Sequence, residues 1–155
     1  MAEIFVFGTL KQDFPNFEFN SGTKLGGSFT TVEKYPLYLI GPRYSPWMIN
    51  NPGVGFQVEG EVFEVNSSGL KAMDDLERVD KNNGSQRMMV PVQSGSGHGT
   101  RDVFVYLKPL DQYLGELEAN NVQSGPWSSY TIEHSLLYRS RKSSKLMDLG
   151  DQNRD

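Results

Sequence analysis

One acidic residue falls on the apolar side of the clearest helix that the sequence predicts. This helix covers residues 67–78, and Asn66 or Ser67 can cap its first turn. Its apolar positions share one face: Leu70, Met73 and Leu76. At about 100° per residue, Glu77 projects within about 20° of Leu70 and so belongs to the same face. The other charged side chains fall toward the opposite side: Lys71, Asp74, Asp75 and Arg78.

A carboxylate in that position indicates either a catalytic residue or a structural residue whose charge is compensated by a partner or by solvent. Burying an ionised carboxylate without partners is costly, so such a residue is paired, placed at a helix end, or retained for a reaction. If Glu77 lines a cavity, partial desolvation favours the raised pKa that suits a general base near neutral pH. The structural alternative stays open: Glu77 can lie at the end of the helix or pair with an arginine such as Arg87.

A second candidate site follows the first predicted strand. Ile4–Phe7 is a continuous apolar run, which is typical of a strand buried on both faces. The run ends at Gly8, and the polar, proline-bearing stretch after it predicts a loop at the carboxyl end of the strand. Loops held on a rigid scaffold often carry functional residues.

The elements that must position these residues have an α+β pattern. Apolar and β-branched runs separated by Gly-Pro, Tyr-Ser-Pro and Asn-Pro-Gly turns predict strands at 29–32, 35–40, 47–49, 56–65, 88–92 and 104–107. The last two can pair as a hairpin, and a second helix is predicted over 111–119. Many strands with few helices favour a small, mostly antiparallel but mixed β-barrel with flanking helices.

The length of 155 residues fits one domain, for which we predict the bounds 1–138. Residues 139–155 are polar and have little to bury, so we predict a mobile tail there. The tail carries Arg139, Arg141, Lys142 and Lys145. A solvated terminus explains this charge better than a binding patch, although a partner-binding tail remains an alternative.

The composition excludes several classes of site. The chain has no cysteine and only two histidines, His98 and His134, far apart in the sequence. Disulfides, a thiol nucleophile and a cysteine or histidine zinc site are therefore not expected. The motifs of phosphate-binding loops, serine hydrolases and zinc proteases are also absent. We expect neither a metal nor a cofactor.

Charge and hydropathy limit the partners. A net charge of -4 and a pI near 5.2 differ from the basic surface of a nucleic-acid-binding protein. No stretch approaches the roughly 18 apolar residues of a membrane-spanning helix, and the N-terminus lacks the basic start of a secretory signal. We expect a cytoplasmic monomer that binds a small molecule, with no nucleic-acid or membrane partner.

A series of ordered blocks resembles the γ-glutamylcyclotransferase-like superfamily, in particular its γ-glutamylamine cyclotransferase and AIG2-like branch. Phe5-Val6-Phe7-Gly8-Thr9-Leu10-Lys11 is similar to the family's opening Tyr-Gly-Thr/Ser-Leu-Lys signature. Further blocks follow in family order: Lys34-Tyr35-Pro36-Leu37, Pro46-Trp47-Met48-Ile49, Asn51-Pro52-Gly53-Val54-Gly55, Val58-Glu59-Gly60-Glu61-Val62-Phe63 and Met73-Asp74-Asp75-Leu76-Glu77. Together they span residues 4 to about 107.

The resemblance implies a small barrel with flanking helices and a lyase- or transferase-type enzyme that needs no cofactor. The reaction implied is release of 5-oxoproline and a free amine from a γ-glutamyl amine such as γ-glutamyl-ε-lysine. Glu77 stands where the family has its catalytic carboxylate. The loop formed by Phe7, Gly8, Thr9 and Leu10 is implied to bind substrate through backbone N–H groups. Tyr106 could join them at the barrel mouth, although core packing is the favoured interpretation for Tyr106, Trp47 and Met48.

One departure from the family pattern leaves a second function open. The tyrosine that precedes the glycine in the family signature is Phe7 here, so a hydroxyl is missing at that point. The alternative is a catalytically weak or inactive binding module for a γ-glutamyl or oxoproline-like ligand. The sequence does not name the departing amine.

Overall fold

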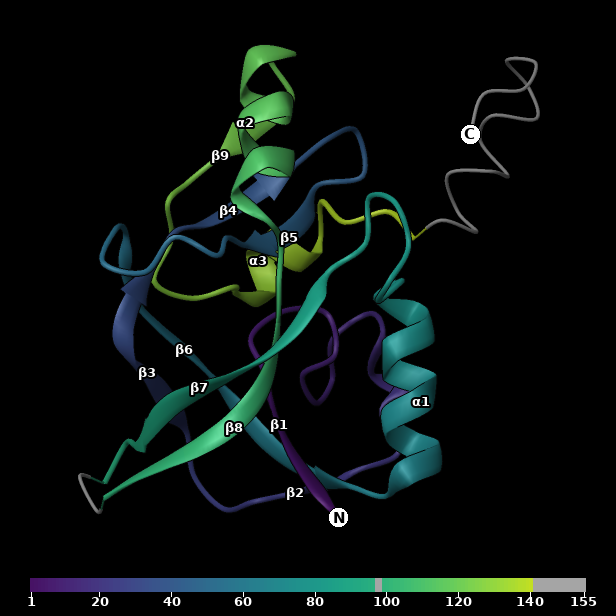
Figure 1. Ribbon diagram of the computed structural model, residues 1–155, viewed down its shortest axis with the longest axis vertical. Coiled ribbons are helices and arrows are strands. Elements are labelled where there is room, and N and C mark those ends of the chain that lie inside the picture. The colour runs from purple at the N-terminus through teal and green to yellow at the C-terminus, as the bar shows by residue number, and fades with distance from the viewer. Residues whose placement is uncertain (97–98, 141–155) are drawn as a thin grey trace.

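A closed, mixed β-barrel forms the body of the protein (Figure 1). The structure is a computed structural model that describes residues 1–96 and 99–140. The barrel strands are β1 (Ala2–Val6), β3 (Phe29–Tyr35), β6 (Phe56–Val65), β7 (Gln86–Ser94) and β8 (Thr100–Leu107). β1 closes the barrel by pairing antiparallel with β6 and parallel with β8, and the remaining pairs are antiparallel. The predicted fold class is therefore confirmed, and so is the hairpin of β7 and β8.

The first strand is buried on both faces, as its continuous apolar run predicts. Phe5 points into the barrel core with valines of β6, β7 and β8. Ile4 and Val6 point the other way, into a second cluster with Phe63 and Met73. Because side chains alternate along a strand, β1 serves both cores at once. The loop that follows β1 is thereby fixed between them.

Helix α1 (Ser67–Leu76) packs against this second cluster on the outside of the barrel (Figure 1). Asn66 caps it, since its side-chain oxygen accepts a hydrogen bond from the amide of Gly69 at 2.8 Å. The helix ends at Leu76 with Glu77 as its C-cap residue, slightly earlier than the predicted end at residue 78. Met73 is fully buried, which confirms the predicted apolar face.

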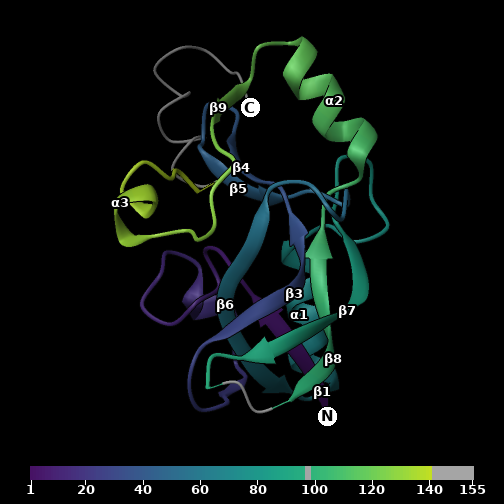
Figure 2. The same ribbon diagram turned by 90° about the vertical axis from the view of Figure 1, so that its left-hand side faces the viewer.

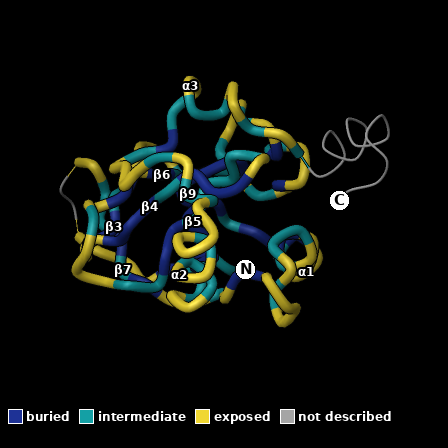
Figure 3. The backbone as a smooth tube through the Cα atoms, turned by 90° about the horizontal axis from the view of Figure 1, so that it is seen from above, coloured by how far each residue is buried: buried dark blue, intermediate teal, exposed yellow. Residues whose placement is uncertain are grey.

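A second, smaller sheet and the chain that follows it lie over one end of the barrel (Figure 2). The sheet contains β4 (Leu37–Ile40), β5 (Ser45–Met48) and β9 (Val122–Ser124). Helices α2 (Leu110–Glu118) and α3 (Ile132–Ser135) bury no residue fully, and Figure 3 shows their exposed side. The sequence predicted α2 but neither β9 nor α3. It also missed η1 (Phe17–Phe19) and β2 (Thr23–Lys24), which are too short to show a period.

Beyond β9, the chain returns to the barrel. The amide of Trp127 donates to the carbonyl of Leu37 in β4, and the amide of Glu59 in the barrel strand β6 donates to the carbonyl of Ser128. Tyr130 is fully buried in the barrel core. Of the predicted tail, only Arg139 and Ser140 are among the described residues, and residues 141–155 lie outside them. In the part that the structure describes, no helix is long and apolar enough to cross a membrane.

Candidate active site

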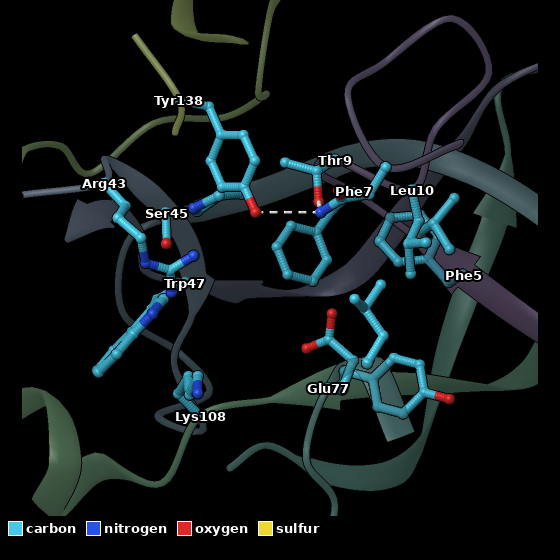
Figure 4. A pocket seen from close by; sticks show the side chains of 16 residues that line it. Phe5, Phe7, Thr9, Leu10, Arg43, Ser45, Trp47, Glu77, Lys108 and Tyr138 are labelled. Carbon is cyan, nitrogen blue, oxygen red and sulfur yellow. Dashed lines mark hydrogen bonds between the residues drawn. The ribbon is translucent and has the colours of Figure 1, made fainter. Parts of the chain in front are cut away.

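All of the site residues predicted from the sequence line one cavity of about 90 Å³ (Figure 4). Phe7, Gly8, Thr9 and Leu10 come from the loop after β1, Glu77 from the end of α1, and Tyr106 from β8. These elements meet because α1 and β8 both pack against β1. The structure thus brings the predicted residues together, and their roles remain predictions.

Glu77 is partly buried and held by Ser85. The hydroxyl of Ser85 donates to Glu77 Oε1 at 2.9 Å, and the amide of Ser85 donates to the Glu77 carbonyl at 3.0 Å. Ser85 itself is 4% exposed. A carboxylate fixed in this way at a cavity wall is preorganised to exchange a proton with a bound ligand.

Of the two structural alternatives for Glu77, the position at the helix end is confirmed, because Glu77 is the C-cap residue of α1, whereas Arg87 pairs with Asp74 instead. Arg87 Nη1 lies 2.7 Å from Asp74 Oδ2, and the hydroxyl of Tyr106 donates to Asp74 Oδ1 at 2.7 Å. Asp74 was predicted on the solvent side of α1, but its side chain is only 24% exposed. The helical periodicity could not predict the partial burial of Asp74, because its partners Arg87 and Tyr106 come from β7 and β8, which lie beside the helix.

Tyr106 lies at 4% exposure, so the expectation of core packing and that of a cavity wall both hold for it. Burial raises the pKa of its hydroxyl well above the ordinary value, and the hydrogen bond to Asp74 adds to the shift. Tyr106 therefore remains a neutral donor to Asp74 at physiological pH. Tyr106 lines the cavity and is joined to α1 through Asp74.

We expect Tyr106→Phe to lower the free energy of unfolding by about 1–2 kcal/mol at pH 7, because Asp74 loses a hydrogen bond. Since the folded protein holds the Tyr106 pKa above its ordinary value, this contribution is complete below about pH 10 and falls as the pH rises further. Urea unfolding of the variant checks both points. Tyr44→Phe is the matched control, since no hydrogen bond joins the Tyr44 hydroxyl to the rest of the described chain. Equal losses in both variants would contradict the expectation.

The loop after β1 turns tightly at the edge of the cavity. The amide of Lys11 donates to the Gly8 carbonyl, and the amide of Asn16 donates to the Thr9 carbonyl at 2.8 Å. The Asn20 side chain donates to the Leu10 carbonyl at 3.0 Å. These bonds occupy the carbonyl groups of Gly8, Thr9 and Leu10. Within residues 1–96 and 99–140, no acceptor is bonded to the amides of Gly8, Thr9 or Leu10, which leaves them available to an anion.

Lys11, the basic residue of the opening block, does not line the cavity. Its ammonium donates to the carbonyl of the buried Tyr130 and lies 4.2 Å from the centre of the Phe14 ring. Burial lowers the pKa of Lys11, while Glu61 and Glu59 oppose that shift. Lys11 therefore ties the returning C-terminal segment to the loop that forms the site.

Replacing Lys11 with methionine is expected to lower the free energy of unfolding by about 1–3 kcal/mol, because the buried Tyr130 carbonyl loses its donor. Methionine retains most of the aliphatic stem, so packing changes little. Chemical denaturation measures the effect, with Lys34→Met at an exposed position as the control. If both variants unfold at the same denaturant concentration as the wild type, the hydrogen bond from Lys11 to the Tyr130 carbonyl does not contribute to the free energy of unfolding.

Several cavity residues were not predicted: Asn16, Arg43, Ser45, Lys108 and Tyr138. Lys108 could have been found, since it lies two positions after Tyr106 and so shares its side of the chain. Trp47 was predicted to pack in the core, but it is only partly buried and lines the cavity, whereas Met48 is fully buried, as predicted. No local sequence pattern indicates that Arg43 and Tyr138 are site residues, because they reach the cavity from a turn and from the end of the described chain.

The described residues contain no group of three or more His, Asp or Glu side chains placed to hold a metal ion. In the described part of the chain, the charged side chains that line the cavity are Glu77, Arg43 and Lys108. The arrangement can therefore exchange a proton through Glu77, bind an anion through loop amides, and offer positive charge on another wall.

Comparison with known proteins points to one family. The model described as gamma-glutamyl cyclotransferase, AIG2-like, matches residues 4–129. Troponin C-akin-1 protein of Drosophila melanogaster is 34% identical over 151 residues, which cover 94% of this chain and 86% of that protein. Gamma-glutamylaminecyclotransferase of Rattus norvegicus is 40% identical over 82 residues, 50% of this chain and 55% of that enzyme. This match spans about half the length of the rat protein, and the same holds for its counterparts in Mus musculus and Homo sapiens.

The solved structures agree. A crystal structure of an AIG2-like protein from Mus musculus superposes with a TM-score of 0.77 at 30% identity and covers 99% of both chains. A solution structure with a TM-score of 0.71 and 32% identity covers 92% of this chain. With the family model matched from β1 to beyond β9 and the barrel reproduced, the chain belongs to the gamma-glutamyl cyclotransferase, AIG2-like family.

Proposed function

We propose that this protein is a γ-glutamylamine cyclotransferase that releases 5-oxoproline and a free amine from a γ-glutamyl amine, with Glu77 as the general acid and base. The observation that carries the proposal is the placement of Glu77. Its carboxylate is partly buried, is held by Ser85, and lines the same cavity as the loop after β1. Family membership and the name of the mammalian relatives support the reaction type.

The reaction needs little from the protein beyond orientation and proton transfer. The α-amine and the γ-carbonyl belong to one molecule, so their approach is already largely intramolecular. The α-nitrogen attacks the γ-carbonyl carbon and forms the bond that closes the five-membered ring. The bond between that carbon and the departing nitrogen then breaks. A small cavity that folds the γ-glutamyl chain back on itself favours this closure.

Glu77 moves the proton. The α-ammonium of the substrate is protonated at neutral pH and must lose a proton before it can attack. A second proton leaves the nitrogen once the new bond has formed. The departing amine gains both protons, one as the bond breaks and one as it becomes an ammonium ion. Glu77 therefore accepts a proton and returns it, and it ends each cycle as a carboxylate.

The loop after β1 provides the anion site. The tetrahedral intermediate places negative charge on the former carbonyl oxygen, and the substrate also carries an α-carboxylate. The amides of Gly8, Thr9 and Leu10 lie at the cavity and are not bonded within the described chain. Backbone donors at fixed positions stabilise such charge without rearrangement. Phe7, which precedes these amides, is partly buried and lines the same cavity.

The direct test is to incubate the purified protein with γ-glutamyl amines and γ-glutamyl dipeptides and to measure 5-oxoproline release. We expect release from at least one γ-glutamyl amine, with the free amine formed in equal amount. If the folded protein turns over no member of the panel but binds one of them, the binding-module alternative replaces the enzyme.

A further inference from the structure

The cavity has two chemically different sides. Figure 4 shows Thr9 and Leu10 on one side, Arg43, Trp47 and Lys108 on the other, and the Glu77 carboxylate between them. The first side offers backbone amides and apolar groups. The second offers two cationic side chains and an indole ring. A ligand that spans both sides therefore meets positive charge beyond Glu77.

Arg43 is held at the cavity by contacts from distant parts of the chain. It lies in the turn between β4 and β5, which is closed by a hydrogen bond from the amide of Tyr44 to the Gly41 carbonyl at 3.1 Å. The Arg43 carbonyl accepts a hydrogen bond from the amide of Arg139 at 2.9 Å. That bond joins the turn to the segment that carries Tyr138, whose hydroxyl is bonded to Asn16 across the cavity.

Most of the donors of the Arg43 guanidinium are not used within the described chain. Its contact there is a long one, 3.5 Å from Nη1 to the Arg139 carbonyl. A guanidinium has five N–H donors in a planar fork that matches a carboxylate. Lys108 differs, because its ammonium donates to the Asn83 carbonyl at 3.0 Å and lies 4.7 Å from the centre of the Trp47 ring. Arg43 is thus the better carboxylate ligand, and Lys108 adds to the positive potential.

We propose that Arg43 determines specificity by binding a carboxylate on the departing amine, so that the preferred substrates are γ-glutamyl amines whose amine half is acidic. This inference rests on the proposed function. The α-amine and α-carboxylate of the γ-glutamyl half share one carbon, so both must lie near Glu77 and the loop amides when the ring closes. The departing amine extends from the γ-carbonyl in the other direction, toward Arg43. Its aliphatic chain lies along Trp47.

A matched pair of substrates tests the proposal: the γ-glutamyl amide of 6-aminohexanoate and that of n-pentylamine. They differ only in the terminal carboxylate. We expect the wild type to favour the acidic substrate by about tenfold to a hundredfold in kcat/KM, the range of a charge-assisted hydrogen bond. Arg43→Gln is expected to bring this ratio close to one through a higher KM for the acidic substrate, and Arg43→Lys to retain part of it.

The control is Arg101→Gln, which removes an arginine paired with Glu3 on the outside of the barrel and should leave the ratio unchanged. A ratio that is the same in the wild type and Arg43→Gln overturns the proposal. Equal losses on both substrates do so too, because Arg43 would then bind the γ-glutamyl half.

A binding measurement separates this inference from the proposed reaction. Calorimetric titration of the same two compounds into Glu77→Gln, with and without Arg43→Gln, needs no turnover. If the acidic compound binds more tightly and loses that advantage with Arg43→Gln, carboxylate recognition stands even where no 5-oxoproline forms. If the two compounds bind alike to Glu77→Gln, the inference fails while the proposed reaction can still hold.

Discussion

Glu77→Gln is expected to lower kcat for 5-oxoproline release by about a hundredfold to ten-thousandfold, the usual contribution of a positioned general acid and base. Glutamine has nearly the same shape as glutamate and keeps an oxygen that can accept the hydrogen bond from Ser85. It cannot accept the proton of the α-ammonium. The melting temperature should therefore stay near that of the wild type while turnover is lost. Steady-state kinetics and thermal unfolding of the same preparation measure both.

Asp75→Asn is the matched control for this experiment. It removes the same charge from the same helix, but Asp75 is exposed and its ion pair with Lys71 has side chains that are 76% and 69% exposed. Such a pair contributes little to stability. Near-normal turnover in Asp75→Asn beside lost turnover in Glu77→Gln assigns the effect to the carboxylate in the cavity. Normal turnover in Glu77→Gln would remove Glu77 from the mechanism.

The strands could be predicted because their sequence patterns reflect what surrounds them. The Ile4–Phe7 run indicates two buried faces, and β1 has a core on each side. The segment 56–65 was predicted with the bounds that β6 has in the structure. Both strands carry dense apolar positions that are bounded by turn residues. Strands of two or three residues, such as β2 and β9, depend on their pairing partners and leave no such pattern.

The candidate site was predictable only where local pattern and function coincide. Glu77 interrupts an apolar face, so the helical wheel alone singles it out. On the same helical wheel, Asp74 falls on the solvent side. Its partners Arg87 and Tyr106 come from strands that pack beside the helix, so the wheel does not include them. Arg43 and Tyr138 reach the cavity through a bond between residues 43 and 139. Contacts between residues so far apart in the sequence depend on the tertiary fold and cannot be predicted from a short stretch of sequence.

The proposed anion site depends on the position of the loop backbone, which Gly8 makes possible. A Cβ atom added to Gly8 would lie 2.9 Å from Cγ and 3.4 Å from Cβ of Pro46 in β5. The proline ring cannot rotate away, so the loop would have to shift. The bonds from Lys11 to the Gly8 carbonyl and from Asn16 to the Thr9 carbonyl link the loop to its surroundings. The shift would therefore move the amides that line the cavity.

We accordingly expect Gly8→Ala to lower kcat/KM for 5-oxoproline release by about tenfold to a hundredfold, the cost of a small misplacement of groups that orient the substrate. Gly26→Ala is the control, because a Cβ at Gly26 meets no atom within 4 Å. Kinetics of both variants, with urea unfolding as the check on stability, give the comparison. Wild-type kcat/KM in Gly8→Ala would mean that the loop amides do not contact the substrate, and the anion would then have to be bound by side chains. A loss of kcat/KM in Gly8→Ala but not in Gly26→Ala would instead support an anion site formed by the backbone amides of the loop.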